Sequence, residues 1–167
     1  MTTRQIVLLL GAFVVAALAL VRPVGGGDGE EAPAGDGMVT RVVDGDTVHV
    51  RVAGEDETVR YIGVDTPESV KPGTPVECFA KAASAANERL VGGQRVRMSY
   101  DAERRDRYGR LLAYVYRTRD GAFVNAELVR QGYARTLTIP PNVRFAERFS
   151  ALARDAREAR RGLWRAC

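Results

Sequence analysis

The feature that most constrains the fold is a set of five short runs rich in β-branched residues. They are Val39–Val43, Val48–Ala53, Thr58–Val64, Arg95–Tyr100 and Leu111–Arg117. In the second run, Val48, Val50 and Val52 alternate with polar residues, so one face of that strand is apolar. Five short strands in a small domain predict a closed or nearly closed β-barrel.

Three helical patterns lie after the third strand. They cover Pro75–Val91, Asn125–Gln131 and a stripe of apolar residues from Phe145 to Leu163. Glycines at 92 and 132 are expected to end the first two helices, and Asn125 is expected to cap the second. The expected fold class is therefore α+β, a five-stranded barrel with three α-helices.

The first 22 residues predict export. Ile6–Val21 is an unbroken apolar run of 16 residues, closed by Arg22 and Pro23. This pattern is typical of a signal peptide, with a small-residue cleavage motif at Ala17–Ala19. An uncleaved membrane anchor is the alternative, although a spanning helix needs roughly 20 residues. We expect a secreted or extracellular protein, held at a membrane only if residues 1–22 are retained.

Residues 23–37 are rich in glycine and acidic side chains and contain nothing that could bury a core. We expect a flexible linker there. Such a linker also argues against a buried core helix at residues 1–22. The folded domain is then expected to span residues 38–167.

The expected domain is basic. It holds 23 Lys and Arg against 17 Asp and Glu, a net charge of +6. An excess of this size attracts anions, and polyphosphates such as nucleic acids are the obvious class. Solubility explains the same charge equally well, so the balance alone does not select a partner.

The chain has two cysteines, Cys78 and Cys167. An even number in an exported chain predicts one disulfide, which would join the C-terminus to the segment around Cys78. Two free buried thiols are the alternative. We do not expect a structural zinc site, because it needs four ligands and the only histidine is His49.

Two clusters of carboxylates follow strands. Asp44–Asp46 lies between the first two runs, and Asp65–Glu68 comes directly after the third. A calcium loop of the EF-hand kind beginning at Asp44 fails, because Val48 and His49 stand where an oxygen ligand and a glycine are needed. Two acids beside a stiff proline turn can still hold a hard cation and a water. A simple capped turn is the alternative.

A third cluster, Asp106–Arg110, lies in a stretch from Glu103 to Arg110 that holds four arginines. The guanidinium group offers a planar fork of donors that matches phosphate. An exposed, charged hairpin loop is the alternative. Together with Arg60, the three clusters supply what phosphodiester hydrolysis requires: carboxylates for a cation, a glutamate for water, and cations where charge develops.

These motifs resemble the staphylococcal nuclease (thermonuclease) family. The similarity runs from Val39 to Trp164 and rests on four blocks in order. They are V-D-G-D-T at 43–47, R-Y-I-G-V-D-T-P-E at 60–68, D-R-Y-G-R-L-L-A-Y-V-Y at 106–116 and A-E-L-V-R-Q-G-Y-A at 126–134. The resemblance implies an OB-fold barrel and a calcium-dependent endonuclease that cleaves DNA and RNA, leaving 3′-phosphates. We expect it to act as a monomer.

The resemblance also implies the ligands and the base. Asp46 and Asp65 would be the carboxylate ligands of Ca²⁺, and Thr66 would add its backbone carbonyl. Glu68 would be the general base. Asp44 matches an acidic position of the family, and we expect it to shape the turn that delivers Asp46.

On the substrate side, Arg60 and Arg110 would bind the phosphate, and Arg107 and Tyr108 would contact a nucleotide phosphate. Two alternatives of other classes are a non-catalytic nucleic-acid-binding module and a surface-anchored adhesion or scaffold domain. The first would be marked by loss of the acidic and arginine residues, which are all present here. The preference between DNA and RNA stays open.

Overall fold

The computed structural model describes residues 34–69, 73 and 75–167. The expected signal peptide or anchor at residues 1–22 and most of the expected linker lie outside the described residues. Within the described ranges, no helix is long and apolar enough to cross a membrane.

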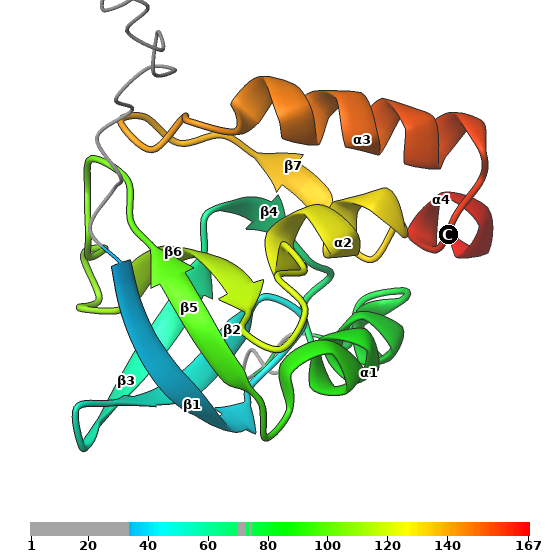
Figure 1. Ribbon diagram of the computed structural model, residues 1–167. Coiled ribbons are helices and arrows are strands. Elements are labelled where there is room, and N and C mark those ends of the chain that lie inside the picture. Colours follow the sequence, from blue (N-terminus) through cyan, green and yellow to red (C-terminus); the bar gives the residue numbers. More distant parts are fainter. Residues whose placement is uncertain (1–33, 70–72, 74) are drawn as a thin grey trace, which may run out of the picture. The chain divides into compact units, whose positions relative to one another are not determined.

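Five strands close into a barrel in the order β1-β2-β3-β6-β5 (Figure 1). They are β1 Ala34–Val42, β2 Thr47–Val52, β3 Glu55–Tyr61, β5 Arg95–Ser99 and β6 Leu111–Arg117. Neighbouring strands are antiparallel except β3 and β6, which run parallel. The predicted five-stranded barrel is confirmed.

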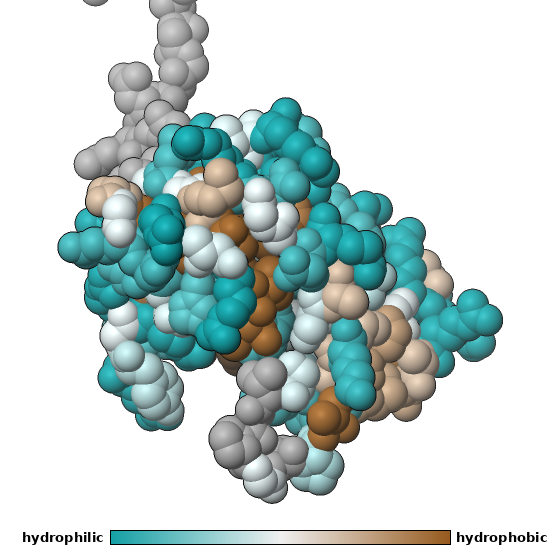
Figure 2. All heavy atoms as spheres, turned by 90° about the horizontal axis from the view of Figure 1, so that it is seen from below, coloured by the Kyte–Doolittle hydropathy of each residue, from teal (hydrophilic) through white to brown (hydrophobic). Residues whose placement is uncertain are grey.

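Alternation along the strands explains why the barrel closes around an apolar interior. Val48 and Val50 on β2, Val59 on β3, and Val96 and Met98 on β5 are all fully buried. The pleat sends the side chains between them outward, where polar residues meet water. Most of the face shown in Figure 2 is hydrophilic, with a hydrophobic strip near its centre and a second hydrophobic area toward the lower right.

The start of the folded domain differs from the expectation. Strand β1 begins at Ala34, so the segment up to Gly37 belongs to the barrel and not to the linker, and it pairs with β5. Composition misled here, because the glycines are needed for close packing. A Cβ at Gly35 would lie 2.9 Å from Tyr100 Oη, and one at Gly37 would clash with the side chain of Val50.

The expected third strand, Thr58–Val64, is divided in two. Strand β3 ends at Tyr61, and β4 (Gly63–Asp65) leaves the barrel to pair with β7 (Arg135–Leu137) in a separate two-stranded sheet. The break falls at Gly63, whose φ of +80° lies in the left-handed region. A side chain at this position would also clash with the ring of Phe149.

Four helices accompany the strands: α1 Ala80–Val91, α2 Val124–Arg130, α3 Ala146–Glu158 and α4 Leu163–Ala166. The first three correspond to the predicted helices, and Figure 1 shows α2 lying between α1 and α3. Helix α1 begins at Ala80 and not at Pro75, because Phe79 has a positive φ of 70°. The third does not continue to Leu163, because Arg160 and Gly162 have positive φ values of 48° and 53°. The apolar stripe therefore ends in a separate one-turn helix.

The expectation that Asn125 caps α2 is wrong. The cap position belongs to Phe123, and Asn125 lies inside the helix with its side chain completely buried. Its Oδ1 accepts a hydrogen bond from Val115 N at 2.9 Å, and its Nδ2 donates to Ile62 O at 2.9 Å and to Ala113 O at 3.3 Å. Asn125 thus joins α2 to β6 and to the end of β3.

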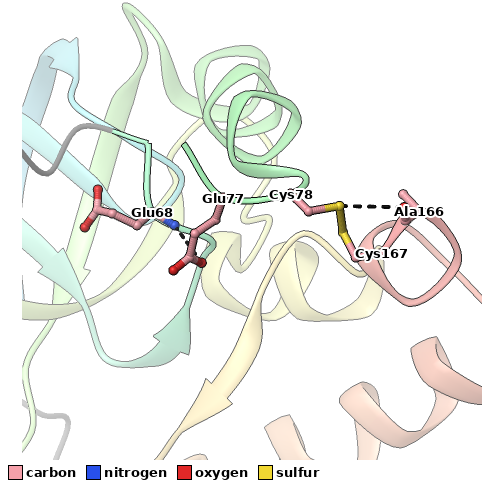
Figure 3. The surroundings of a disulfide bond; sticks show 5 residues. All are labelled: Glu68, Glu77, Cys78, Ala166 and Cys167. Atoms are coloured by element: carbon pink, nitrogen blue, oxygen red, sulfur yellow. Dashed lines mark hydrogen bonds between the residues drawn. A yellow bond between two sulfur atoms is a disulfide. The ribbon is translucent and has the colours of Figure 1, made fainter. Parts of the chain in front are cut away.

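Cys78 and Cys167 form a disulfide with their Cα atoms 6.0 Å apart, so neither is a free thiol. The bond joins the residues before α1 to the C-terminal residue after α4 (Figure 3). The two cysteines are separated by 89 residues in sequence.

Candidate functional site

The turn between β1 and β2 places the first carboxylate. Val43 N donates to Thr47 O at 2.9 Å, and Asp46 N donates to Asp44 Oδ1 at 3.0 Å. Asn87 of α1 also holds the turn, because its Nδ2 donates to Asp44 O at 2.9 Å. Asp44 therefore has the turn-shaping contacts that its position in the sequence predicts.

The Asp46 carboxylate is buried, with 4% of the residue exposed. Its Oδ2 accepts hydrogen bonds from Thr66 N at 2.7 Å and Thr66 Oγ1 at 2.9 Å, and its Oδ1 lies 3.1 Å from Arg60 Nη1. Burial raises the pKa of Asp46 to about 6, against the opposing attraction of Arg60. This turn and the segment after β4 thus meet through one carboxylate.

Arg60, on β3, connects both acids. Its Nη2 donates to Asp65 Oδ1 at 3.0 Å, while its Nη1 donates to Val64 O at 2.8 Å and lies against Asp46. The Arg60 side chain is only 15% exposed, whereas that of Asp65 is half exposed. The carboxylates are therefore arranged around a fixed guanidinium group.

The oxygen atoms here fit a hard cation. Asp46 and Asp65 offer carboxylates, and Thr66 is held beside them by its hydrogen bonds to Asp46. Carboxylate and carbonyl oxygens are the ligands that calcium prefers. No group of three or more His, Cys, Asp or Glu that could hold a metal occurs among the described residues.

The second guanidinium group comes from the turn before β6. Arg110 Nε donates to Asp106 Oδ2 at 2.7 Å, and Arg110 N donates to Asp106 Oδ1 at 3.0 Å. Gly109, with a φ of +82°, allows the tight turn between them. Asp106 was not predicted as a site residue, although an Asp three residues before a Gly is a signal of such a turn.

Arg60 and Arg110 line the same cleft, which has a volume of about 470 Å³. Arg107 and Tyr108 also line it, and the Arg107 guanidinium lies 4.8 Å from the centre of the Tyr108 ring. Tyr108 is 68% exposed. The structure therefore brings the four predicted substrate-binding residues together, from two segments of the chain.

Other residues that line the cleft were missed by sequence reasoning. They include Leu137 of β7 and Ile139, both with exposed apolar side chains, and the buried Asn142. Asn142 Oδ1 accepts from Glu103 N at 2.8 Å and its Nδ2 donates to Glu103 O at 2.9 Å. No pattern in the sequence joins these residues to the arginines.

Glu68 is not among the described residues that line this cleft. It follows the buried Pro67 after Thr66, and its backbone N donates to Glu77 Oε2 at 3.2 Å. Figure 3 shows the Glu68 side chain directed away from Glu77 and from the disulfide. Its predicted role as the base therefore stays a prediction, and Glu77 is a neighbour that the sequence did not reveal.

Taken together, these contacts place the carboxylates of Asp46 and Asp65 against Arg60, which lines the cleft with Arg110, although neither acid is itself among the described residues that line it. The cleft can accept an anion, and the acids can accept a cation next to it. A phosphodiester bound by the arginines and by such a cation would have its negative charge neutralised by both.

Comparisons with known proteins agree with this chemistry. The family model described as "Staphylococcal nuclease homologue" matches residues 58–166. The protein named "Thermonuclease" from Staphylococcus intermedius is 44% identical over 127 residues, which cover 76% of this chain and 74% of that protein. The "Thermonuclease" of Staphylococcus hyicus is 41% identical over 126 residues, covering 75% and 73%. "Endonuclease YncB" of Bacillus subtilis strain 168 is 39% identical over 126 residues, covering 74% and 59%.

Proposed function

The chain belongs to the staphylococcal nuclease family, and we propose that it is a calcium-dependent extracellular endonuclease that hydrolyses DNA and RNA. The relatives are named as thermonucleases and endonucleases, which supports a nuclease acting on nucleic acid. The observation that carries the proposal is the position of Arg60, in contact with both Asp46 and Asp65 and on the same cleft as Arg110.

Asp46, Asp65 and the backbone carbonyl of Thr66 are the ligands we propose for Ca²⁺. When bound, the cation would neutralise charge on the phosphate and polarise the attacking water. Extracellular calcium fills sites with dissociation constants on the order of 10⁻⁴–10⁻³ M, so a small set of ligands suffices outside a cell.

The residues of the chain would act on the phosphate and the water. Arg60 and Arg110 donate hydrogen bonds to phosphate oxygens, which gain charge as the bond breaks. Glu68 accepts a proton from the water whose oxygen attacks phosphorus. The P–O5′ bond breaks and the 5′ oxygen takes up a proton from solvent, leaving a 3′-phosphate and a 5′-hydroxyl. Glu68 then releases its proton to solvent, which restores the base. Arg107 and Tyr108 contact a neighbouring nucleotide.

All the proposed site residues come from one chain, so we propose that a monomer is active. Export would depend on residues 1–22. Cleavage there would release the enzyme, and retention would hold it at the membrane.

The test is a cleavage assay on single-stranded DNA, duplex DNA and RNA over a range of calcium concentrations. Glu68→Gln should lower kcat by about 10²–10⁴-fold while binding of DNA is kept, because the amide accepts no proton from water. Glu158→Gln, on the exposed face of α3, is the matched control and should cleave normally.

Three results separate the alternatives. Addition of EGTA should stop cleavage, whereas a module that only binds nucleic acid would keep binding and never cleave. Plasmid that stays intact with saturating calcium would support an adhesion or scaffold domain and contradict the proposed function. Normal cleavage by Glu68→Gln would show that the base is another residue.

A further inference from the structure

Glu68 and Glu77 contact each other across the segment that joins β4 to α1. Glu77 N donates to Glu68 O at 2.9 Å, and Glu68 N donates to Glu77 Oε2 at 3.2 Å. In Figure 3 the Glu77 carboxylate lies at the Glu68 nitrogen. Glu77 therefore bonds both the backbone N–H and the backbone carbonyl of Glu68. Its carboxylate is a strong acceptor for the N–H group.

The next residue along the chain ties Glu77 to the C-terminus. Cys78 is bonded to Cys167, whose N–H donates to Leu163 O at 3.0 Å. Leu163 is 2% exposed, and its own N–H donates to Gly132 O at 2.8 Å. The disulfide thus joins the Glu68–Glu77 pair to a helix that is packed against the end of α2.

The start of α1 has an anchor of its own. The Phe79 ring stacks on Tyr133 with 5.6 Å between ring centres, and Ala83 N donates to Phe79 O at 3.0 Å. Loss of the disulfide should therefore leave α1 in place and loosen Cys78 and Glu77, because the bond from Ala80 N to Glu77 O at 3.1 Å is then the main remaining tie of Glu77 to the helix. Both cysteines are exposed, so a reductant can reach them.

We propose that Glu77 is a positioning residue for Glu68, and that the Cys78–Cys167 disulfide keeps Glu77 in place. The inference rests on the proposed role of Glu68 as the general base. A base must lie within hydrogen-bond reach of its water, and a misplacement of about 1 Å can cost on the order of 100-fold in rate. Full activity then requires an oxidising compartment, where the disulfide persists.

Substitution of Glu77 tests the hydrogen bond. Glu77→Ala should lower kcat by roughly 10- to 100-fold with little change in KM, because substrate contacts are untouched. Glu77→Gln keeps a side-chain oxygen that can accept from Glu68 N, so it should restore most of kcat. Glu158→Ala removes an exposed carboxylate elsewhere and should change neither constant. Equal kcat in Glu77→Ala and the unmodified protein would overturn the positioning role.

The disulfide is tested with and without a thiol reductant. Reduction of the unmodified protein should lower kcat to the level of the double variant Cys78→Ser/Cys167→Ser. The double variant itself should not respond to the reductant. A reduced protein with unchanged kcat would overturn the part of the inference that concerns the disulfide.

Hydrogen exchange at the Glu68 amide provides a measurement that needs no cleavage. Exchange should be faster in Glu77→Ala and in the double serine variant than in the unmodified protein and Glu77→Gln. The Ala83 amide, bonded to Phe79 O, reports whether α1 is still folded. Equal Glu68 exchange in all four proteins overturns this inference whatever the cleavage assay shows. If Glu68 exchange differs among the four proteins as expected but the unmodified protein cleaves no nucleic acid, the proposed function is overturned instead.

Discussion

Arg60 illustrates at the scale of single residues how the site is held together. Its guanidinium group contacts Asp46 at 3.1 Å and Asp65 at 3.0 Å, and the first of these ion pairs is almost completely buried. A buried carboxylate that loses its cation keeps the cost of desolvation without the compensating attraction. The same residue that we propose as a phosphate ligand therefore also stabilises the fold.

Arg60→Ala should lower the free energy of unfolding by roughly 3–5 kcal/mol, since it leaves Asp46 buried without its ion pair. Arg51→Ala is the matched control, because the Arg51–Asp56 pair is more than half exposed on both sides. Such an exposed pair contributes little to stability, because water and salt screen its charges. Urea denaturation without calcium measures both. Similar losses in the two variants would contradict the structural role of Arg60.

Asn125 is a second residue whose stabilising contacts are made with segments far from it in sequence. Asn125→Ala should cost on the order of 3 kcal/mol, because Val115 N and Ile62 O lose a partner inside the protein. Gln131→Ala removes one bond, to Glu127 on the same helix surface, and should cost less than about 1 kcal/mol. Thermal and urea unfolding compare the two. A small effect at Asn125 would mean that water replaces its hydrogen bonds.

At the scale of elements, the break between β3 and β4 decides where the second acid lies. Strand β3 carries Arg60 along the barrel, and β4 carries Asp65 into the sheet with β7. The chain changes direction at Gly63, where the Phe149 ring of α3 lies against the backbone. This turn allows Arg60 to reach Asp65, five residues ahead, with its side chain.

Gly63→Ala should therefore destabilise the protein more than an ordinary change at a left-handed glycine. Gly54 is the matched control, because its φ of +92° is similar but a Cβ there would meet nothing within 4 Å. Both variants should lose about 1 kcal/mol from backbone strain. Gly63→Ala should lose roughly 1–3 kcal/mol more from the clash with Phe149. Equal losses in urea denaturation would contradict the packing of α3 on this turn.

At the scale of the whole molecule, binding and folding are linked. A ligand that binds only the folded state stabilises it, because unfolding must first release the ligand. The proposed calcium ligands come from the turn between β1 and β2 and from the end of β4, which only the folded barrel brings together. Calcium should therefore raise the stability of the entire domain.

Calcium at about 100 times its dissociation constant should add about 2.7 kcal/mol and raise Tm by roughly 5–10 °C. Asp46→Asn and Asp65→Asn should lose this shift, because each removes a carboxylate ligand. Asp56→Asn, at an exposed ion pair, should keep it. Calorimetry with and without calcium measures the shift. An equal response in all of these variants would contradict the proposed ligands.

The amino-acid sequence by itself determined the barrel strands and the position of the functional blocks along the chain. Runs of β-branched and aromatic residues gave β2, β5 and β6 with nearly the observed bounds, and in β2 the apolar residues also alternate with polar ones. The motif blocks gave Arg60 and Arg110, which the structure places on one cleft. Such patterns are local, so they can be read without the fold.

Only the tertiary structure decided which distant residues support those blocks. No periodic pattern in the sequence indicates three of these contacts. They are the strand pairing of Gly35 and Gly37, the buried hydrogen bonds of Asn125, and the contact of Glu77 with Glu68. Each depends on a hydrogen bond or a close approach between segments that are separated along the chain. Their geometry is fixed when the barrel and helices pack, because two residues can form a hydrogen bond or a close contact only when they are near each other in space, whatever their separation in sequence.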